Sequence, residues 1–239
     1  MNLKLTLTGA ALVLLFGVAS TPNPANAQVS AQGGGYLLRI KWTPGQSYKY
    51  DVVTKVSVGG KGAKPIEQHS PYVMKVLTVK NGVATLQVKA DVSGLVGGKG
   101  QSINNTLKVD SRGKILEGDK SSVGFFELPE KPVKLNTPWT SNQSAQTPIG
   151  KMAIKATYKL TGTKTVNGKK MLVVATTTSG TSSTMNTSGG GTMLVEMKDG
   201  MMFSMDSVQN MSIKGAGTTS GSGSAPQTMP VSVSVKRIP

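Results

Sequence analysis

Hydrophobic and polar residues alternate one by one along much of this chain. In residues 47–58, Tyr48 and Tyr50 share one face while Lys49 and Asp51 share the other. A period of two residues is typical of a half-buried β-strand. No stretch keeps the longer period of a helix, so the pattern predicts an all-β protein.

Turn signals separate the alternating segments and predict hairpins. The Thr-Pro-Gly-Gln segment at residues 43–46 would join a strand at 36–42 to the strand at 47–58. The Asn-Gly pair at 81–82 is the strongest short hairpin signal, because both residues tolerate positive φ. The Ser-Arg-Gly segment at 111–113 predicts a further tight turn.

The same landmarks recur in the same order later in the chain. Asn-Gly at 167–168 follows Asn-Gly at 81–82, and the turn at 198–200 follows the turn at 111–113. Both spacings are about 86 residues, and landmarks repeated at a nearly constant spacing indicate a duplicated unit. We therefore predict two related copies of one β-meander.

The copies span residues 36–118 and 135–211, and a last strand is expected at 230–238. The expected fold class is all-β: an antiparallel meander whose two related halves form a barrel, half-barrel or sandwich. Residues 28–239 would form a single domain. Residues 215–229, rich in Gly, Ser and Thr, are expected to be a flexible loop.

The copies are joined by residues 124–134, which contain two prolines and make a poor central strand. We expect a crossover that packs Phe125, Phe126 and Leu128 onto the core.

Sequential pairing would place the tight turns at one end of the sheet and the long glycine-rich connections at the other. The predicted long loops are residues 59–70, 94–102, 179–191 and 215–229. Functional residues tend to lie on loops that a rigid scaffold holds in place. The glycine-rich end is therefore the candidate working face.

The first residues have the features of an export signal, residues 1–27. Lys4 precedes a short apolar segment at residues 10–19, and Ala25-Asn26-Ala27 resembles a cleavage site before Gln28. The apolar segment is too short to span a bilayer. We expect a periplasmic or extracellular protein with no transmembrane segment in the mature chain.

The formal net charge of +16 favours an anionic partner, either envelope polysaccharide or lipid headgroups. Only three of the cations are arginines, the residue that recognises phosphate bidentately, and nucleic acid is not expected. Two Val-Gly-Gly-Lys-Gly segments carry Lys61 and Lys99 into predicted loops at the same end. These two lysines are the candidate ligand-binding residues, and a plain solvated surface is the alternative. Neither segment is a phosphate loop, because the spacing is wrong and no helix follows.

Residues 128–139, Leu-Pro-Glu-Lys-Pro-Val-Lys-Leu-Asn-Thr-Pro-Trp, resemble an LP-x-KPVK-x-GD-x-W pattern. That pattern occurs in an uncharacterised family of exported bacterial β-rich proteins, and residues 43–50 are similar to the first strand of that family. The chain departs from it at Asn136 and Thr137, which replace Gly-Asp. The resemblance implies an exported β-protein and carries no activity.

Catalytic residues are scarce. The chain has one histidine, His69, and no cysteine, which excludes thiol chemistry, disulfides and a histidine-rich metal site. His69 is expected in an exposed loop at residues 67–71. Ser111 and Lys114 match S-x-x-K only formally, because they flank a predicted turn.

Two carboxylate pairs remain as candidates for hydrolysis: Glu127 with Glu130, and Glu117 with Asp119. No aromatic-lined cleft accompanies them. We expect no enzyme activity, no cofactor and no metal site.

Eight of the 12 methionines lie between Met185 and Met229. Thioether sulfur can hold Cu(I) outside the cytoplasm. However, Met193 alternates with Val195 on one predicted strand and Met201 with Met205 on the next, so a methionine-rich core is the favoured interpretation.

The leading functional hypothesis is an exported, non-catalytic binding or structural protein of the cell envelope, which holds anionic glycan or lipid headgroups. The alternative is a carrier that encloses an apolar ligand in a curved sheet. A hydrolase is the third possibility.

Overall fold

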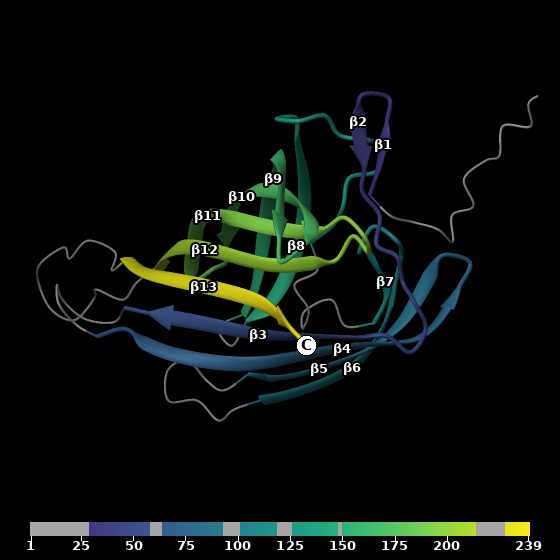
Figure 1. The fold of residues 1–239 in the computed structure, drawn as a ribbon. Coiled ribbons are helices and arrows are strands. Elements are labelled where there is room, and N and C mark those ends of the chain that lie inside the picture. Colours follow the sequence, from purple (N-terminus) through teal and green to yellow (C-terminus); the bar gives the residue numbers. More distant parts are fainter. Residues whose placement is uncertain (1–28, 58–63, 93–100, 119–125, 148–149, 214–227) are drawn as a thin grey trace, which may run out of the picture.

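The computed structural model describes residues 29–57, 64–92, 101–118, 126–147, 150–213 and 228–239. Within these ranges the regular elements are all β-strands, so the predicted all-β class is confirmed. One antiparallel sheet contains 11 strands (Figure 1). A separate pair is formed by β1 (Ser30–Gln32) and β2 (Gly35–Leu37).

The first half of the chain contributes five strands to the large sheet. They are β3 (Ser47–Val56), β4 (Ile66–Lys80), β5 (Val83–Val92), β6 (Gln101–Val109) and β7 (Ile115–Glu117). Each pairs antiparallel with the next strand along the chain.

The second half contributes a second antiparallel meander and the strand that joins the two. The meander strands are β8 (Pro138–Thr147), β9 (Gly150–Val166), β10 (Lys169–Thr181), β11 (Met185–Glu196) and β12 (Met202–Ile213). The last strand, β13 (Thr228–Ile238), pairs with β12 on one side and with β3 on the other. β3 and β13, which come first and last in chain order among the strands of the large sheet, are therefore neighbours.

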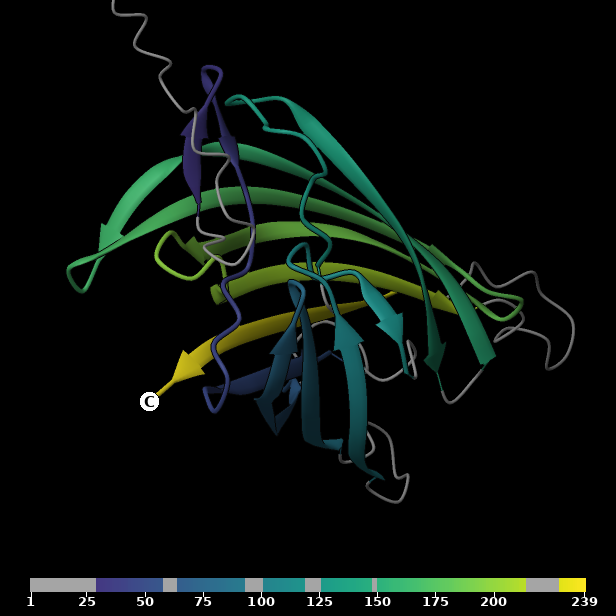
Figure 2. The same ribbon diagram turned by 90° about the vertical axis from the view of Figure 1, so that its right-hand side faces the viewer.

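The sheet is strongly curled, so that β8–β12 arch over the concave side of β3–β6 (Figure 2). Its order is β7-β6-β5-β4-β3-β13-β12-β11-β10-β9-β8, with β7 and β8 at the two edges. In the described part of the chain these two edge strands do not pair with each other.

Four tight connections lie at one end of the sheet, here called the turn end. Two are Asn-Gly turns in which both residues have positive φ: 51° and 77° at Asn81 and Gly82, and 50° and 75° at Asn167 and Gly168. The other two follow β6 and β11 and end at Gly113 and Gly200. The Asn-Gly signals therefore predicted both hairpins correctly.

Two β-bulges occupy corresponding places in the two meanders. Leu77 of β4 and Thr161 of β9 are each an extra residue in the ladder. The carbonyl before the first bulge accepts a hydrogen bond from Gly45 N at 2.9 Å, and the carbonyl before the second accepts one from Asn136 N at 2.7 Å. Both donors have positive φ, 82° and 62°.

The strand predicted at residues 36–42 is wrong. β2 ends at Leu37, and residues 38–42, here called the strap, run across the turn end without joining the sheet. The strap donates from Ile40 N to Ser111 O at 2.6 Å and from Lys41 N to Asp199 O at 2.8 Å. The alternation of buried and exposed residues is present, but it reports an extended chain with one buried face, which need not lie in a sheet.

The loop predicted at residues 179–191 is also wrong. β10 continues to Thr181, β11 starts at Met185, and three consecutive glycines lie inside β11. A Cβ atom on Gly190 would lie 2.8 Å from the carbonyl oxygen of Thr176, so this glycine run permits close approach of neighbouring strands. The loop predicted at residues 59–70 is wrong from Ile66 onward, where β4 begins. The rest of that loop falls largely on residues 58–63, and the remaining predicted loops fall largely on 93–100 and 214–227, outside the described residues.

One hydrophobic cluster inside the curl contains residues from both meanders. It includes Leu86 and Leu107 from the first and Leu160 and Met193 from the second. The crossover, residues 126–133, adds the buried Leu128, while Phe126 packs against the cluster from its edge, as predicted. Phe125 lies outside the described residues.

Candidate ligand-binding cavity

Lys61 and Lys99, the candidate binding residues from sequence, lie outside the described residues. The strands that lead to them, β3 and β5, run in the same direction on either side of β4. Their connections therefore leave the sheet at the end opposite the turn end.

The concave side of the sheet forms a half-open cavity of about 390 Å³. It lies between β3 and β4 on one side and β8–β13 on the other, and the strap and the crossover contribute one side chain each. Apolar and aromatic residues form most of its wall: Ile40, Tyr50, Val52, Tyr72, Met74, Phe126, Ile154, Ala156, Tyr158, Met193, Met201, Met202, Met205 and Val235. The volume is within the range of about 300 to 1,000 Å³ that is usual for small-molecule sites.

The remaining wall residues are polar and uncharged. They are Gln143, Thr176, Thr178, Ser207 and Gln209. Within the described residues, the cavity wall contains no lysine, arginine, aspartate or glutamate. A buried charge without a partner is costly, so this cavity suits an uncharged group.

Aromatic contacts hold the wall in shape. Tyr158 stacks on Trp139 with the ring centroids 5.4 Å apart and lies 6.0 Å from Phe126. Tyr50 donates its hydroxyl hydrogen to Met202 O at 3.0 Å. Burial raises the pKa of Tyr158 to about 12 and also raises the pKa of Tyr50 and Tyr72. These tyrosines therefore stay neutral at physiological pH.

The methionines behave as the core interpretation predicts. Met193 and Met201 are buried, and Met202 and Met205 are partly buried against the same core. An unbranched thioether side chain adapts to an irregular cavity wall.

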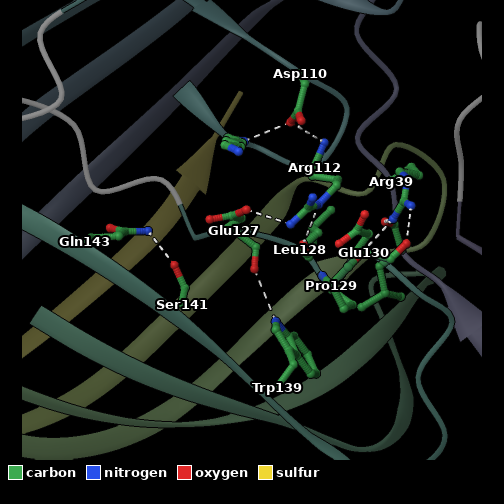
Figure 3. A network of polar contacts seen from close by, with 12 residues as sticks. Arg39, Asp110, Arg112, Glu127, Leu128, Pro129, Glu130, Trp139, Ser141 and Gln143 are labelled. Carbon is green, nitrogen blue, oxygen red and sulfur yellow. Dashed lines mark hydrogen bonds and ion pairs between the residues drawn. The ribbon is translucent and has the colours of Figure 1, made fainter. Parts of the chain in front are cut away.

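All three arginines bind other segments of the protein at the turn end. Arg39 donates to the carbonyl oxygens of Pro129 at 2.8 Å and Glu130 at 2.6 Å. Arg112 donates to the carboxylate of Glu127 at 2.6 Å (Figure 3). The planar fork of arginine suits such fixed multiple contacts, which explains why the exposed cations are lysines.

The crossover links the two edges of the sheet at the turn end. Glu127 receives Arg112 from the turn after β6, and its carbonyl oxygen accepts from Trp139 Nε1 of β8 at 3.2 Å (Figure 3). Leu128 N donates to Arg112 O at 2.8 Å. The edge strands are thus connected through side chains and loop backbone, not through strand pairing.

The third arginine, Arg237 of β13, lies between the buried carboxylate of Glu196 and the partly buried carboxylate of Asp199. It pairs with Glu196 and with Asp199, the latter at 2.9 Å. Lys169 approaches Glu196 at 3.4 Å from a more exposed position. This ion cluster fastens the last strand to the turn after β11.

His69 lies in β4 and not in a loop, so that expectation is wrong. It lies 3.4 Å from Asp51 and 3.3 Å from Glu67, on an exposed part of the sheet. A hydrogen bond from Lys55 lowers the pKa of Glu67. No group of three potential metal-binding His, Asp or Glu side chains occurs within the described ranges.

The candidate hydrolytic carboxylates make structural contacts. Glu127 pairs with Arg112, and Glu117 pairs with Lys108 at 2.7 Å. Ser111 and Lys114 flank the hairpin turn, as expected. Asp119 lies outside the described residues. The expectation that the protein is not an enzyme stays a prediction.

A second hollow, of about 540 Å³, lies on the opposite face of β3 and β11–β13. Its wall contains Lys55, Lys164 and Asp206, so both signs of charge are present. Lys55 is already paired with Glu67 at 2.8 Å. The uncharged inner cavity is therefore the better-defined site, although it is the smaller of the two.

The chain matches no protein-family model and no curated protein sequence. Within the described residues, no helix is long and apolar enough to cross a lipid bilayer.

Proposed function

We propose that this protein is an exported, non-catalytic carrier that holds an apolar ligand inside a half-barrel formed by its curled sheet. The observation that carries the proposal is the 390 Å³ cavity, whose described wall is mostly apolar and contains no charge. Removal of alkyl groups from water supplies about 0.8 kcal/mol for each buried CH₂ group. Unpaired edge strands support the half-barrel over a closed barrel.

The export part of the proposal rests on the features of residues 1–27 and on the resemblance of residues 128–139 to exported β-rich proteins. The matching turns and bulges of the two meanders support an origin by duplication.

A second candidate function is the binding of an anionic envelope glycan or lipid headgroup at the outer surface. The net charge of +16 favours it. Such binding would weaken steeply as salt is added, whereas capture of an apolar ligand would not. Salt dependence therefore separates the two candidates.

The test is a titration of the purified protein with n-alkanols of increasing chain length. Each added CH₂ group should strengthen binding about fourfold until the cavity is full, after which affinity stops rising. Affinity that does not depend on chain length would refute the carrier proposal.

A pair of variants locates the binding. Ala156 is buried in the cavity wall, and Ala153 lies on the exposed face of the same strand. Ala156→Phe should fill the cavity and lower the affinity for long alkanols at least tenfold. Ala153→Phe adds the same group outside and should leave the affinity unchanged.

A further inference from the structure

Two adjacent cross-strand rows on the cavity face carry neutral polar groups. The first row is Thr176, Gly191 and Ser207, which are partners across β10, β11 and β12. The second row is Thr178, Gly189 and Gln209. These six residues are here called the polar notch.

The glycines in the middle of both rows shape the polar notch. Thr178 Oγ1 donates to Gln209 Oε1 at 2.8 Å, although β11 lies between the two strands. A Cβ atom on Gly189 would lie 2.7 Å from that same Oε1. The absence of a side chain at Gly189 therefore permits the hydrogen bond. Glycine inside a strand commonly marks a place that another group approaches closely.

Three polar side chains of the polar notch can still form hydrogen bonds with a ligand. Among the described residues, Gln209 Nε2 donates to no protein group once Oε1 has accepted from Thr178. The side chains of Thr176 and Ser207 likewise make no side-chain hydrogen bond with the described residues, although both residues are buried and line the cavity. Among the described residues, the buried side-chain polar atom without a partner is Tyr48 Oη, so these three groups are accessible from the cavity. A bound group with oxygen atoms would form the hydrogen bonds that they can still make.

The next row toward the turn end is entirely apolar. It contains Val174, Met193 and Met205, and Val235 follows on β13. The cavity therefore has a polar part and an apolar part side by side. Its volume is near the lower limit for small-molecule sites, which favours a single alkyl chain.

We propose that the polar notch binds the uncharged, oxygen-bearing head group of a single-chain amphiphile, whose alkyl chain lies against Met193 and Met205. This inference rests on the proposed carrier function and adds the class of ligand. Gln209 donates to an oxygen of the head group, and the hydroxyls of Thr176 and Ser207 contact it. A carboxylate head is disfavoured because no cation lines the described wall to pair with it.

The test compares three probes with the same chain: octane, octanoate and mono-octanoylglycerol. Displacement of an uncharged naphthalene fluorophore reports their affinities at about pH 8. Mono-octanoylglycerol should bind roughly tenfold more tightly than octane, the effect of a well-made hydrogen bond or two. Gln209→Leu should remove that advantage, whereas octane, which forms no hydrogen bond, should bind at least as tightly to the more apolar wall.

Two further variants control for folding and position. Thr178→Val preserves shape and should also reduce the advantage of the glycerol head. Asn210→Leu makes the same type of change on the exposed face of β12 and should have no effect. Thermal unfolding of each variant shows whether the fold is intact.

The outcomes separate the two proposals. If octane binds but the glycerol head adds nothing, or if Gln209→Leu and Thr178→Val both keep its advantage, the head-group inference is wrong and the carrier function stands. Tightest binding of octanoate also overturns the inference. If no probe binds, the carrier function fails and the inference fails with it.

Discussion

The two hairpin turns after β6 and β11 share a closing glycine, although the second is one residue longer: Asp110 N donates to Lys114 O in the first, and Glu196 N donates to Met201 O in the second. Each ends in a glycine with positive φ, 81° at Gly113 and 70° at Gly200. Each glycine also lies against a covering segment: a Cβ atom on Gly113 would meet Phe126 O of the crossover, and one on Gly200 would meet Arg39 O of the strap. Both turns thus need glycine for its conformation and for its small size.

The charges of these two turns are reversed. The residue before Gly113 is Arg112, which pairs with Glu127 of the crossover. The residue before Gly200 is Asp199, which pairs with Arg237 of β13. Each turn is thus joined to a distant segment by an ion pair, with the cation in the first turn and the carboxylate in the second.

The two ion pairs also differ in burial. The side chains of Arg237 and Glu196 are 12% and 6% exposed, whereas those of Arg112 and Glu127 are 23% and 25% exposed. Water compensates a lost partner better at the first turn than at the second. Substitutions at these turns and at the Asn-Gly hairpins should therefore differ in how much they lower the free energy of unfolding.

Arg237→Met should have the largest effect. It leaves the buried carboxylate of Glu196 and the partly buried carboxylate of Asp199 without their main cation, and such a loss costs about 3 to 5 kcal/mol of unfolding free energy. Urea denaturation followed by tryptophan fluorescence measures the change.

The pH dependence of this variant checks the cause. Burial already raises the pKa of Asp199, and removal of Arg237 makes the charged form costlier still. A folded-state pKa above the unfolded value gives stability that is present at low pH and lost as pH rises. The stability deficit of Arg237→Met should therefore be smaller at about pH 4 than at about pH 7. An equal deficit at both values would show that packing, not charge, is the reason.

Gly200→Ala should come next. The new methyl group meets the strap carbonyl of Arg39 and also forces alanine into positive φ. We expect a loss of about 2 to 4 kcal/mol, part from backbone strain and part from displacement of the strap. Thermal unfolding measures it, and a loss as small as that of Gly82→Ala would mean that the strap is not tightly held.

Arg112→Met should cost less than Arg237→Met. One carboxylate, Glu127, loses its partner, and it is a quarter exposed. We expect a loss of about 1 to 3 kcal/mol in urea denaturation. A cost equal to or greater than that of Arg237→Met would reverse the ranking by burial.

Gly82→Ala and Gly168→Ala should have the smallest effects, and equal ones. Both positions have positive φ and no atom within 4 Å of a Cβ atom. The loss should be about 1 kcal/mol for each, the cost of strain alone. A clear difference between them in thermal unfolding would show that the two Asn-Gly hairpins are not equivalent.

The strands and turns were predictable because their signals are local. The alternation around Tyr48 and Tyr50 reports which side chains are buried, and Asn-Gly reports a turn whose φ values few other residues accept. The same locality explains the errors. The strap alternates like a strand because one face is buried, and whether a neighbouring strand completes the ladder depends on residues more than 60 positions away, such as Ser111.

The cavity could be proposed from sequence only in general terms. The cavity wall depends on the curl of the sheet, which brings β4 opposite β10. A local sequence pattern does not predict which strands come to face each other across a sheet. The glycine run in β11 was interpreted as a loop. Glycine-rich sequence is found both in flexible loops and in strands that pack closely against a neighbour, so composition alone does not distinguish the two. The small number of arginines was evident from the sequence. The structure shows the reason, because each arginine contacts a segment distant in the chain.

The pairing of β13 with β3 sets a time order for folding. β13 follows the other strands of the large sheet along the chain, so neither meander has its inner neighbour until β13 has been made. The contact between β3 and β13 joins residues far apart in sequence, such as Val56 and Val231, and such distant contacts slow folding. Until that moment the chain exposes the strand edges of β3 and β12, which are templates for pairing with other molecules. The inner edges of both meanders therefore stay open to other strands until β13 pairs with β3 and β12.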